Sequence, residues 1–555
     1  MSRKPRFPAR ALLVLLLITT SIKLAIVLAP RSDLYFTNAN RQPTTFIGEE
    51  VHRGTTALDL IEGTVMPVQD YQYAPFFGGS LVVAYAAIPF FLVFGPSMGT
   101  LKLTGICFNA VAVAFLFLAL HRFAGRRAAW IGGLLFAVAA PGYSILSLTA
   151  FGTHVENNAF AMICVYLFLL TSERDRPRPG AAFLLGLVAG FATYFGYVIL
   201  VTLGTLLVCA LAVERRALFR RDRVIVLAGY AVGLIPWLVY NATHDFAGIE
   251  IYGAPVGGHY LDSAADVARR AKALLTDAFP RSFFFRDLGS WTGYWQGVVA
   301  GSIVLLLAIL GGLFGRRRSQ AAGGPGRETP PITPARLALV YVLVFVAAYA
   351  LSDFSSGGLV GFAVTYRYVY PLYPFLFMAA AVALDALWGK GVSGRTTALG
   401  CTGFLLVLGV TGDAGLVEPG NYGVNFERPG YSRSALGRFV VLTYAESPEH
   451  LTDRIQVVID RARKVRSEEE YDLFLFGMGM TLRHSVGPLE DARPRFVRMI
   501  ADLEELRLYL LEHIEEEYKP YFRKLQPGER EYAFDQRDAF RRAPERRRAQ
   551  EPHGG

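Results

Sequence analysis

The chain has 555 residues, of which 53% are hydrophobic and only 18% are charged, and its mean hydropathy is +0.33. These values exclude an ordinary soluble enzyme and indicate a protein that crosses a membrane many times. The net charge of +10 does not indicate a nucleic-acid partner, because the basic residues lie mainly in short links between apolar runs and in the last tail, as the positive-inside bias predicts.

The first apolar run, 11–30, follows the basic start RKPRFPAR and in this respect resembles a signal peptide. The run is long, however, and Pro30 directly follows the plausible cleavage site at Ala29. We therefore predict an uncleaved first helix. A polar outer loop, 31–76, comes next.

Further apolar runs through residue 415 predict an all-helical polytopic membrane protein with about 11–13 spans. Basic links separate the runs and are predicted to face the cytoplasm, above all ERRALFRRDR at 214–223. The polar segments 150–157, 241–294 and 353–366 are predicted to lie on the opposite face with the outer loop. The number of crossings agrees with this arrangement only if one of the two runs that follow the outer loop, 77–94 and 101–120, is re-entrant or lies along the interface. The runs lie near 77–94, 101–120, 128–149, 158–170, 181–213 (long enough for two), 224–240, 296–314, 336–352, 369–388 and 396–412.

The composition changes after the last apolar run. Two stripes of apolar residues at helical spacing predict a small soluble helical domain at 416–526, and the stripes are expected to form its core. The basic tail 527–555 is predicted to be disordered. The stripes contain Leu451, Ile455, Val458, Ile459, Ala462 and Val465, and then Met499, Leu503, Leu506 and Leu510.

The polar stretch 48–79 opens with two adjacent carboxylates, Glu49 and Glu50. Adjacent side chains cannot both face one partner on a regular helix or strand, so one is expected to act as a base or metal ligand while the other orients a neighbour. The alternative is that these charges merely solvate a loop. The same stretch offers further polar and aromatic groups for contacts to a substrate, namely His52, Asp70, Gln72 and Tyr73.

A second polar patch, FGTHVENN, spans 151–158. His154 and Glu156 share a face if this segment is extended, and they point in nearly opposite directions if it is helical. Gly152 before them and two asparagines after them predict a loop that leads into a helix. Ionisable groups at the ends of membrane helices are costly unless they are paired or face a cavity. His154 and Glu156 therefore line a polar pocket, or they pair with each other, or they snorkel to water.

A third patch, YRYVYPLYP, spans 366–374 and begins a spanning run. Arg367, flanked by Tyr366, is suited to grip a phosphate through its planar fork of donors, with Lys102 as a second cation. The alternative is an interfacial aromatic belt with a snorkelling arginine.

Together these segments resemble the GT-C class of integral-membrane glycosyltransferases, over residues 1–415. In the branch that includes protein O-mannosyltransferases and lipid A aminoarabinose transferases, the first loop usually reads Asp-Glu, then an alanine-rich helix, a Gly and a Tyr/Pro-rich segment. Glu50 matches the Glu, whereas Glu49 stands where Asp is usual and adds a methylene. GTHVENN resembles a Gly-x-His-x-Glu patch of bacterial members, and YRYVYPLYP resembles an Arg-Tyr-x-x-Pro-x-x-Pro helix start. Further matching positions are Ala57, Leu58, Leu60, Gly63, Gln72, Tyr73 and Gly78.

The resemblance implies an inverting transfer of a sugar from a polyprenyl-phosphate donor to a lipid, glycan or protein acceptor. It implies a bacterial inner (plasma) membrane protein with its active site facing the periplasm. Glu49 would be the general base, Arg367 would bind the donor phosphate, and His154 and Glu156 would line the sugar pocket.

Some members of the class use a divalent metal ion and some do not. If this chain uses one, Glu50 and His154 are the expected ligands. Two alternatives remain open from the sequence: a flippase or transporter of lipid-linked sugars, and a non-catalytic GT-C-like binding subunit.

Overall fold

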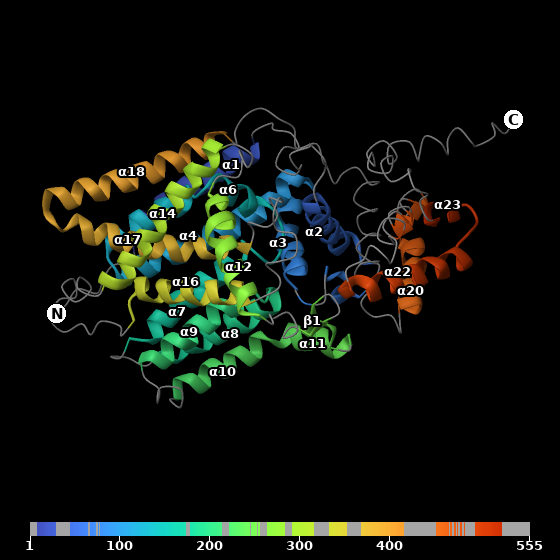
Figure 1. Cartoon of the computed structure of the whole chain (residues 1–555). Coiled ribbons are helices and arrows are strands. Elements are labelled where there is room, and N and C mark those ends of the chain that lie inside the picture. The colour runs from blue at the N-terminus through green and yellow to red at the C-terminus, as the bar shows by residue number, and fades with distance from the viewer. Residues whose placement is uncertain are drawn as a thin grey trace. The chain divides into compact units, whose positions relative to one another are not determined.

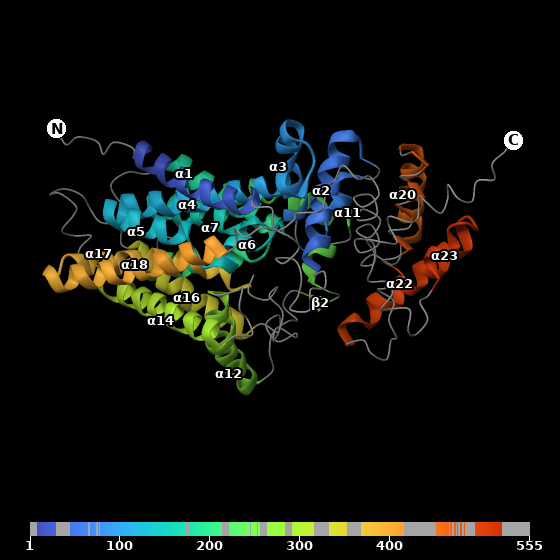
Figure 2. The ribbon, with the colours of Figure 1, turned by 90° about the horizontal axis from the view of Figure 1, so that it is seen from above.

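The computed structural model describes residues 8–28, 45–64, 67–73, 76, 78–173, 178–213, 221–244, 246–251, 254–255, 263–283, 291–315, 332–351, 368–415, 451–465 and 494–523, with a few residues between 467 and 482. The described elements are almost all helices (Figure 1), as the turned view also shows (Figure 2). Strands within this part are limited to the antiparallel pair β1 (Glu250–Ile251) and β2 (Ala254–Pro255).

The chain forms two compact units. The first unit comprises Met1–Phe46, Lys102–Val239 and His259–Gly423. The second unit comprises Ile47–Leu101, Tyr240–Gly258 and Val424–Gly555.

Most membrane helices belong to the first unit. Its elements are α1 (Ala9–Leu28), most of α4 (Met98–Phe123), α5 (Arg126–Ala137), α6 (Pro141–Leu148), α7 (Asn157–Thr171), α8 (Pro179–Phe195), α9 (Ile199–Val213), α10 (Arg221–Gly233), the start of α11 (Ile235–Thr243), α12 (Ala264–Ala273), the π-helix η6 (Leu274–Ala278), α13 (Phe279–Ser282), α14 (Trp291–Phe314), α16 (Pro334–Leu351), the 3-10 turn η9 (Tyr370–Leu372), α17 (Tyr373–Trp388) and α18 (Gly391–Gly415).

Six of the described helices are long and apolar enough to cross a membrane, and the number rises to eight if two bent pairs each count as one span. The pairs are α5–α6, bent by 75°, and α10–α11, bent by 47°. Proline at the start of α6 and near the start of α11 removes a backbone donor, which favours such breaks. Shorter apolar helices occupy Gly79–Phe94, Asn157–Thr171, Pro179–Phe195 and Ile199–Ala212. The apolar runs predicted from the sequence form helices, with breaks at 138–140 and 196–198, and the polytopic all-helical class is confirmed. Among the described helices, six to eight rather than the expected 11–13 are long and apolar enough to cross a membrane.

Helices α8 and α10 pack closely against each other. Gly186 and Gly190 on α8 face Gly229 and Gly233 on α10. A Cβ atom at Gly190 would lie 2.2 Å from the backbone oxygen of Tyr230, which is far inside contact distance. The two glycine stripes therefore let the backbones approach as closely as small-residue motifs allow in membranes.

Helix α17 is the central helix of the first unit and contacts α5, α14, α16 and α18. Its first ring, Tyr373, is fully buried, and Phe375 stacks on Tyr341 of α16 with 3.5 Å between ring centroids. Pro371 and Pro374 lie in the first turns, where proline is tolerated because those amides have no intrahelical partner. The third polar patch of the sequence thus leads into a helix whose first turns, from Tyr373 to Ala381, are buried.

The second unit contains the polar segment after the first span. Its elements are α2 (Thr45–Glu62), the 3-10 turn η2 (Val68–Tyr71), α3 (Gly79–Phe94), the end of α11 with the 3-10 turn η4 (Ala247–Ile249), and the C-terminal helices α20 (Leu451–Val465), α22 (Pro494–His513) and α23 (Lys519–Phe522). Helix α2 ends at Gly63, whose φ of 126° is open to glycine and strained for other residues.

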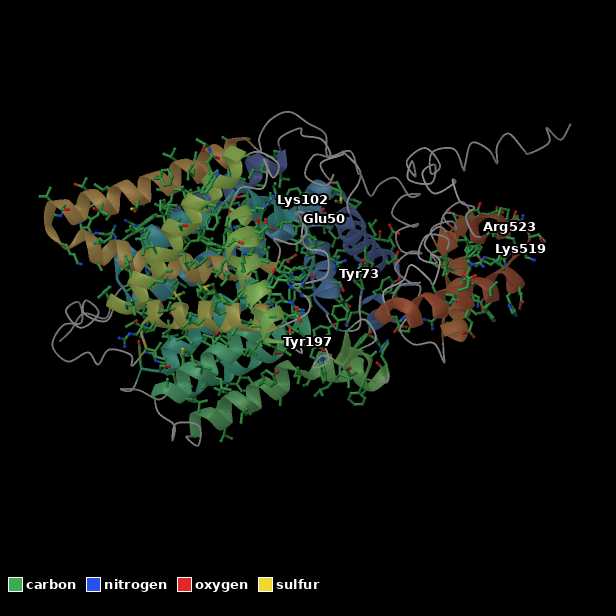
Figure 3. The ribbon with its side chains drawn as sticks, viewed as in Figure 1. Glu50, Tyr73, Lys102, Tyr197, Lys519 and Arg523 are labelled. Carbon is green, nitrogen blue, oxygen red and sulfur yellow. The ribbon has the colours of Figure 1, made fainter. Side chains whose placement is uncertain are left out.

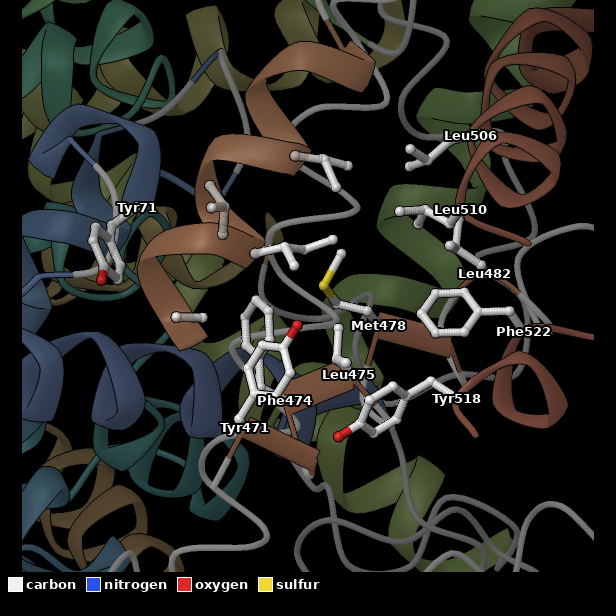
Figure 4. Packing of buried hydrophobic residues seen from close by; sticks show 14 of the residues in the cluster. Tyr71, Tyr471, Phe474, Leu475, Met478, Leu482, Leu506, Leu510, Tyr518 and Phe522 are labelled. Carbon is white, nitrogen blue, oxygen red and sulfur yellow. The ribbon is translucent and has the colours of Figure 1, made fainter. Parts of the chain in front are cut away.

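The C-terminal helices bury the two apolar stripes that the sequence predicts as core (Figure 4). Ile455, Val458, Ile459 and Ala462 of the first stripe and Leu506 and Leu510 of the second are all buried. The other members of the stripes lie outside the described side chains, and the predicted disordered tail lies outside the described residues.

Candidate active site

Helix α2 is a polar helix that is buried on all sides along its middle. Glu50 and Arg53 are 0% exposed, and His52 and Asp59 are 1% exposed. Burying ionisable groups is costly unless each is hydrogen-bonded or paired. The alternative reading, in which these charges solvate a loop, therefore does not hold for the described side chains.

The acid pair lies in the first turns of this helix. Glu49 belongs to α2, although its side chain lies outside the described part, whereas Glu50 is completely buried. Neighbouring residues on an α-helix are rotated by about 100° about its axis. Adjacent positions on a helix therefore cannot both face one partner, and the separate roles of the two carboxylates stay a prediction.

The turn η2 folds back onto α2 and completes a hydrogen-bonded cluster. The hydroxyl of Tyr71 donates to Oδ2 of Asp59 at 3.0 Å, and the Thr56 hydroxyl lies 3.2 Å from Nε2 of His52. The guanidinium of Arg53 lies over the ring of Tyr73, 4.6 Å from its centroid. Glu50 and Tyr73 are both marked in Figure 3. Two candidates named from the sequence, His52 and Tyr73, are thus brought together, with ring centroids 5.4 Å apart.

His52 is held in its neutral form. Burial lowers its pKa well below the usual value, and the neighbouring charge of Arg53 lowers it further, while a hydrogen bond with the backbone of Tyr71 opposes both effects. A neutral imidazole can orient a hydroxyl but adds no positive charge to the cluster.

Asp70 contacts a residue that the sequence does not pair with it. Its Oδ1 lies 2.7 Å from Nε2 of His244, and both side chains are nearly buried. Nδ1 of His244 lies 2.9 Å from the backbone oxygen of Tyr240, whose ring stacks on the imidazole at 4.1 Å. Gln72, the next candidate along the chain, is 1% exposed. The contact joins two segments that the sequence assigns to one face of the membrane.

The first unit brings the second and third polar patches together. The ring of His154 meets the ring of Tyr368 edge-on, with 4.7 Å between centroids. The side-chain amide of Asn158 donates to the backbone oxygen of Tyr370 at 3.3 Å. Tyr366 and Arg367, which directly precede Tyr368, lie outside the described residues.

The patch at 151–158 is a loop that leads into α7, as the sequence predicts. Gly152 has a φ of 84°, and its amide donates to Oε1 of Glu156 at 2.9 Å. Asn157 begins the helix and donates to the backbone oxygen of Gly196 at 3.3 Å. Glu156 is 2% exposed and His154 is 8% exposed. Neither side chain reaches bulk water, so the reading in which the patch merely extends to solvent does not hold.

A tyrosine that sequence reasoning missed packs beside this patch. Tyr143 of α6 is 0% exposed, and its hydroxyl donates to Oδ1 of Asn109 at 3.1 Å. Its ring stacks on Tyr373 of α17 at 5.4 Å. Nothing in the local pattern around Tyr143 distinguishes it from the other aromatics of the apolar runs.

Two charged residues inside membrane helices were also not singled out from the sequence. Lys23 of α1 is 0% exposed, and its Nζ donates to the Ser144 hydroxyl at 2.6 Å. Asp413 of α18 is 4% exposed and lies near enough for its charge to interact with that of Lys23. The signal was present, because an ionisable residue inside a spanning run is a functional candidate in its own right.

Two further cations of the first unit are buried. Lys102, considered from the sequence as a second phosphate ligand, is 1% exposed on α4. Arg270 of α12 is 6% exposed. The composition of α12, a short amphipathic helix in a predicted outer loop, did not single out Arg270.

A metal site does not emerge from the described residues, in which no group of three or more His, Cys, Asp or Glu side chains is placed to hold an ion. The two expected ligands, Glu50 and His154, belong to different units.

Solved structures similar to the chain include two of ArnT from Cupriavidus metallidurans. The apo structure has 13% sequence identity and a TM-score of 0.43, and the match covers 90% of this chain and 85% of that one. The structure bound to undecaprenyl phosphate has 14% identity and a TM-score of 0.46, covering 92% and 89%. The oligosaccharyltransferase AglB from Archaeoglobus fulgidus, in complex with an inhibitory peptide and a dolichol-phosphate, has 14% identity and a TM-score of 0.45, covering 78% and 58%.

No protein-family model matches the chain, and no curated protein sequence matches it. The similar structures are GT-C glycosyltransferases, the class that the sequence resembles. At 13–14% identity they assign neither a residue nor a ligand to this chain.

Proposed function

We propose that the protein is an inverting glycosyltransferase that moves a sugar from a polyprenyl-phosphate donor to an acceptor hydroxyl. The observation that carries the proposal is helix α2, which follows the first span and buries Glu50, His52, Arg53 and Asp59 almost completely. Desolvating four ionisable side chains on one helix costs stability, and such clusters are typical of functional sites.

The acid pair supplies the base. Glu49 takes the proton of the acceptor hydroxyl, whose oxygen attacks the anomeric carbon of the sugar from the face opposite the phosphate. The electron pair of the bond that breaks leaves with the phosphate, and the configuration at the anomeric carbon inverts. Because phosphate is already a competent leaving group, catalysis needs mainly proton removal and charge stabilisation. Glu50, one position along α2, supports the base.

The donor is held by residues at the start of α17 and the patch before α7. Arg367, with Tyr366, binds the phosphate through charge-assisted hydrogen bonds. His154 and Glu156 line the sugar pocket. The 4.7 Å contact between His154 and Tyr368 supports this arrangement, because Tyr368 directly follows Arg367 in the chain. His52, Asp70, Gln72 and Tyr73 are assigned to further substrate contacts in the second unit.

The reaction is assigned to the outer face of a bacterial inner membrane. The segments 31–76 and 241–294 lie opposite the basic links in the charge pattern of the sequence. The hydrogen bond between Asp70 and His244 supports a common face for these two segments.

The test is a transfer assay on membranes that contain the full-length protein, with a panel of radiolabelled polyprenyl-phosphate sugars. The expected result is release of polyprenyl phosphate matched one-to-one by label in lipid, glycan or protein. Separating these three fractions identifies the acceptor class. Absence of transfer from every donor in the panel, with the protein correctly inserted, would contradict the proposal.

A flippase for lipid-linked sugars is the second candidate, and the bent pairs α5–α6 and α10–α11 favour it. Broken membrane helices are typical of transporters, in which they flank a central substrate site. Proteoliposomes discriminate between the two functions. A flippase moves the intact lipid-linked sugar across the bilayer without forming a glycosidic bond, whereas a transferase forms that bond. A non-catalytic subunit does neither.

A further inference from the structure

The C-terminal helices share one apolar core with the segment that follows the first span. Tyr71 of η2 and Leu81 of α3 belong to the same buried cluster as Ile455 of α20 and Leu510 of α22 (Figure 4). All these parts fall in the second unit. The C-terminal helical domain is therefore not a module that packs only on itself.

Tyr71 connects this shared core with helix α2. Its side chain is 0% exposed, so the ring is fully enclosed. Its hydroxyl donates to Oδ2 of Asp59, which is 1% exposed, at 3.0 Å. A hydrogen bond to a buried carboxylate is charge-assisted and costly to leave unmade. The ring thus belongs to the C-terminal core, while the hydroxyl holds a residue of α2.

A second contact anchors the same end of α2. Leu60, adjacent to Asp59, is partly buried and packs against the shared cluster, as do Val68 and Tyr73 on the next segment. The ring of Tyr73 in turn lies under the guanidinium of Arg53. Apolar packing and a buried hydrogen bond therefore fix the C-terminal half of α2 at neighbouring positions.

We propose that the C-terminal helical domain positions helix α2, with Tyr71 and Leu60 as the positioning residues. The helix carries the acid pair at its other end, and a rigid helix transmits a displacement along its length. Small misplacements of catalytic groups cost large factors in rate. The effect on transfer rests on the proposed function, whereas the effect on the packing of α2 does not.

The test compares two leucines of α22. Leu510 is 1% exposed in the shared core, and Leu508, two positions earlier, is 50% exposed, which makes Leu508→Ala the matched control for Leu510→Ala. The reporter is Thr55→Cys on α2, where the native side chain is 0% exposed. Its labelling by a membrane-impermeant maleimide is followed in the full-length protein. The protein without this cysteine serves as the blank.

We expect Leu510→Ala to raise the labelling rate at position 55 by about tenfold or more, because local opening exposes groups in a cooperative unit. Leu508→Ala should stay within about twofold of the parent protein. If Leu510→Ala does not accumulate, the milder Leu510→Val replaces it, with a smaller rise expected. Equal labelling in the core and control variants would overturn the proposal.

Tyr71→Phe separates the hydroxyl from the ring. This variant keeps the ring in the core and removes the hydrogen bond to Asp59, so the rate of sugar transfer should fall. Leu510→Ala should lower that rate by a smaller factor in the Tyr71→Phe protein than in the parent protein. If the double variant loses transfer rate by the full product of the two single factors, the role assigned to Tyr71 is overturned. The parent and all variants could lack transfer while Leu510→Ala still labels faster than Leu508→Ala at position 55. That result would contradict the proposed function but not the coupling of the C-terminal helices to α2.

Discussion

Lys23 and Asp413 carry opposite charges inside the first and last membrane helices of the first unit. Both side chains are buried, and Lys23 donates to Ser144 on the half-helix α6 at 2.6 Å. Removing an ion from water costs several kcal/mol, which the partner charge and a hydrogen bond offset. Each charge therefore lowers the cost of burying the other.

Neutralising one member of this couple should be far worse than neutralising both. Lys23→Met or Asp413→Asn alone leaves one buried charge without its opposite and should lower stability by about 1–3 kcal/mol, less than the loss of a buried pair in direct contact. The double variant should recover most of that loss. Thermal unfolding of the purified proteins in one detergent measures the three values. A double variant that loses the sum of the single effects would show that the charges are independent.

His52 predicts a dependence of stability on pH. Its pKa in the folded protein is lowered, first by burial and then by Arg53, whereas the imidazole of the unfolded chain titrates near its usual value of about 6.5. Below that pH the unfolded chain binds a proton that the folded protein does not, so stability falls. The slope from this residue is at most about 1.4 kcal/mol per pH unit, and above pH 6.5 the contribution vanishes.

The measurement compares unfolding midpoints at pH 7.5 and 5.5. Other groups also titrate in this window, so the wild-type protein is compared with His52→Gln, which cannot bind the proton. We expect a smaller loss of stability between the two pH values in the variant. Equal losses would mean that His52 is as easily protonated in the folded protein as in the unfolded chain.

At the scale of single elements, local patterns predict the helices well. The apolar runs fix the spans because only a helix satisfies its own backbone in lipid. Gly63 marks the end of α2, and Gly152 and the asparagines mark the loop before α7, since each of these signals acts within a few residues. The predicted core stripes of α20 and α22 are buried for the same reason.

Contacts between elements that are distant in the chain could not be predicted from local sequence patterns. Asp70 and His244 are 174 positions apart, and Lys23 and Ser144 are 121 positions apart. Neither pair shares a periodic pattern, because their proximity is set by the packing of whole helices. The role of Tyr71 in a core built mostly from residues beyond 450 was hidden for the same reason.

The glycine contact of α8 with α10 yields a prediction for these elements. Gly190→Val places a branched side chain where a Cβ atom alone would approach the backbone oxygen of Tyr230 to 2.2 Å. Overpacking of this kind costs at least about 1–3 kcal/mol. Gly204→Val on α9 is the matched control, because a Cβ at Gly204 meets nothing within 4 Å. Fluorescence-detected size-exclusion chromatography after heating compares the two. Equal stability would contradict the close packing of α8 on α10.

At the scale of the whole molecule, the charge pattern predicts the orientation in the membrane. The densest basic run, ERRALFRRDR, follows α9 and extends into the first turn of α10, and it should be cytoplasmic. A single cysteine at position 220 should resist a membrane-impermeant maleimide added outside intact cells, and one at position 41 should react. Labelling at 220 from outside would contradict this orientation.

The measurement that tests the central claim most directly is sugar transfer by Glu49→Gln and Glu50→Gln, assayed side by side with Glu49→Asp. Glu49→Gln keeps the size and removes the charge, so insertion should survive while transfer falls by roughly 10²-fold or more if Glu49 is the base. Glu49→Asp should keep substantial activity, because it only shortens the side chain by one methylene. Normal turnover in Glu49→Gln with none in Glu50→Gln would exchange the two roles. Full activity in both glutamine variants would contradict the claim that helix α2 carries the chemistry.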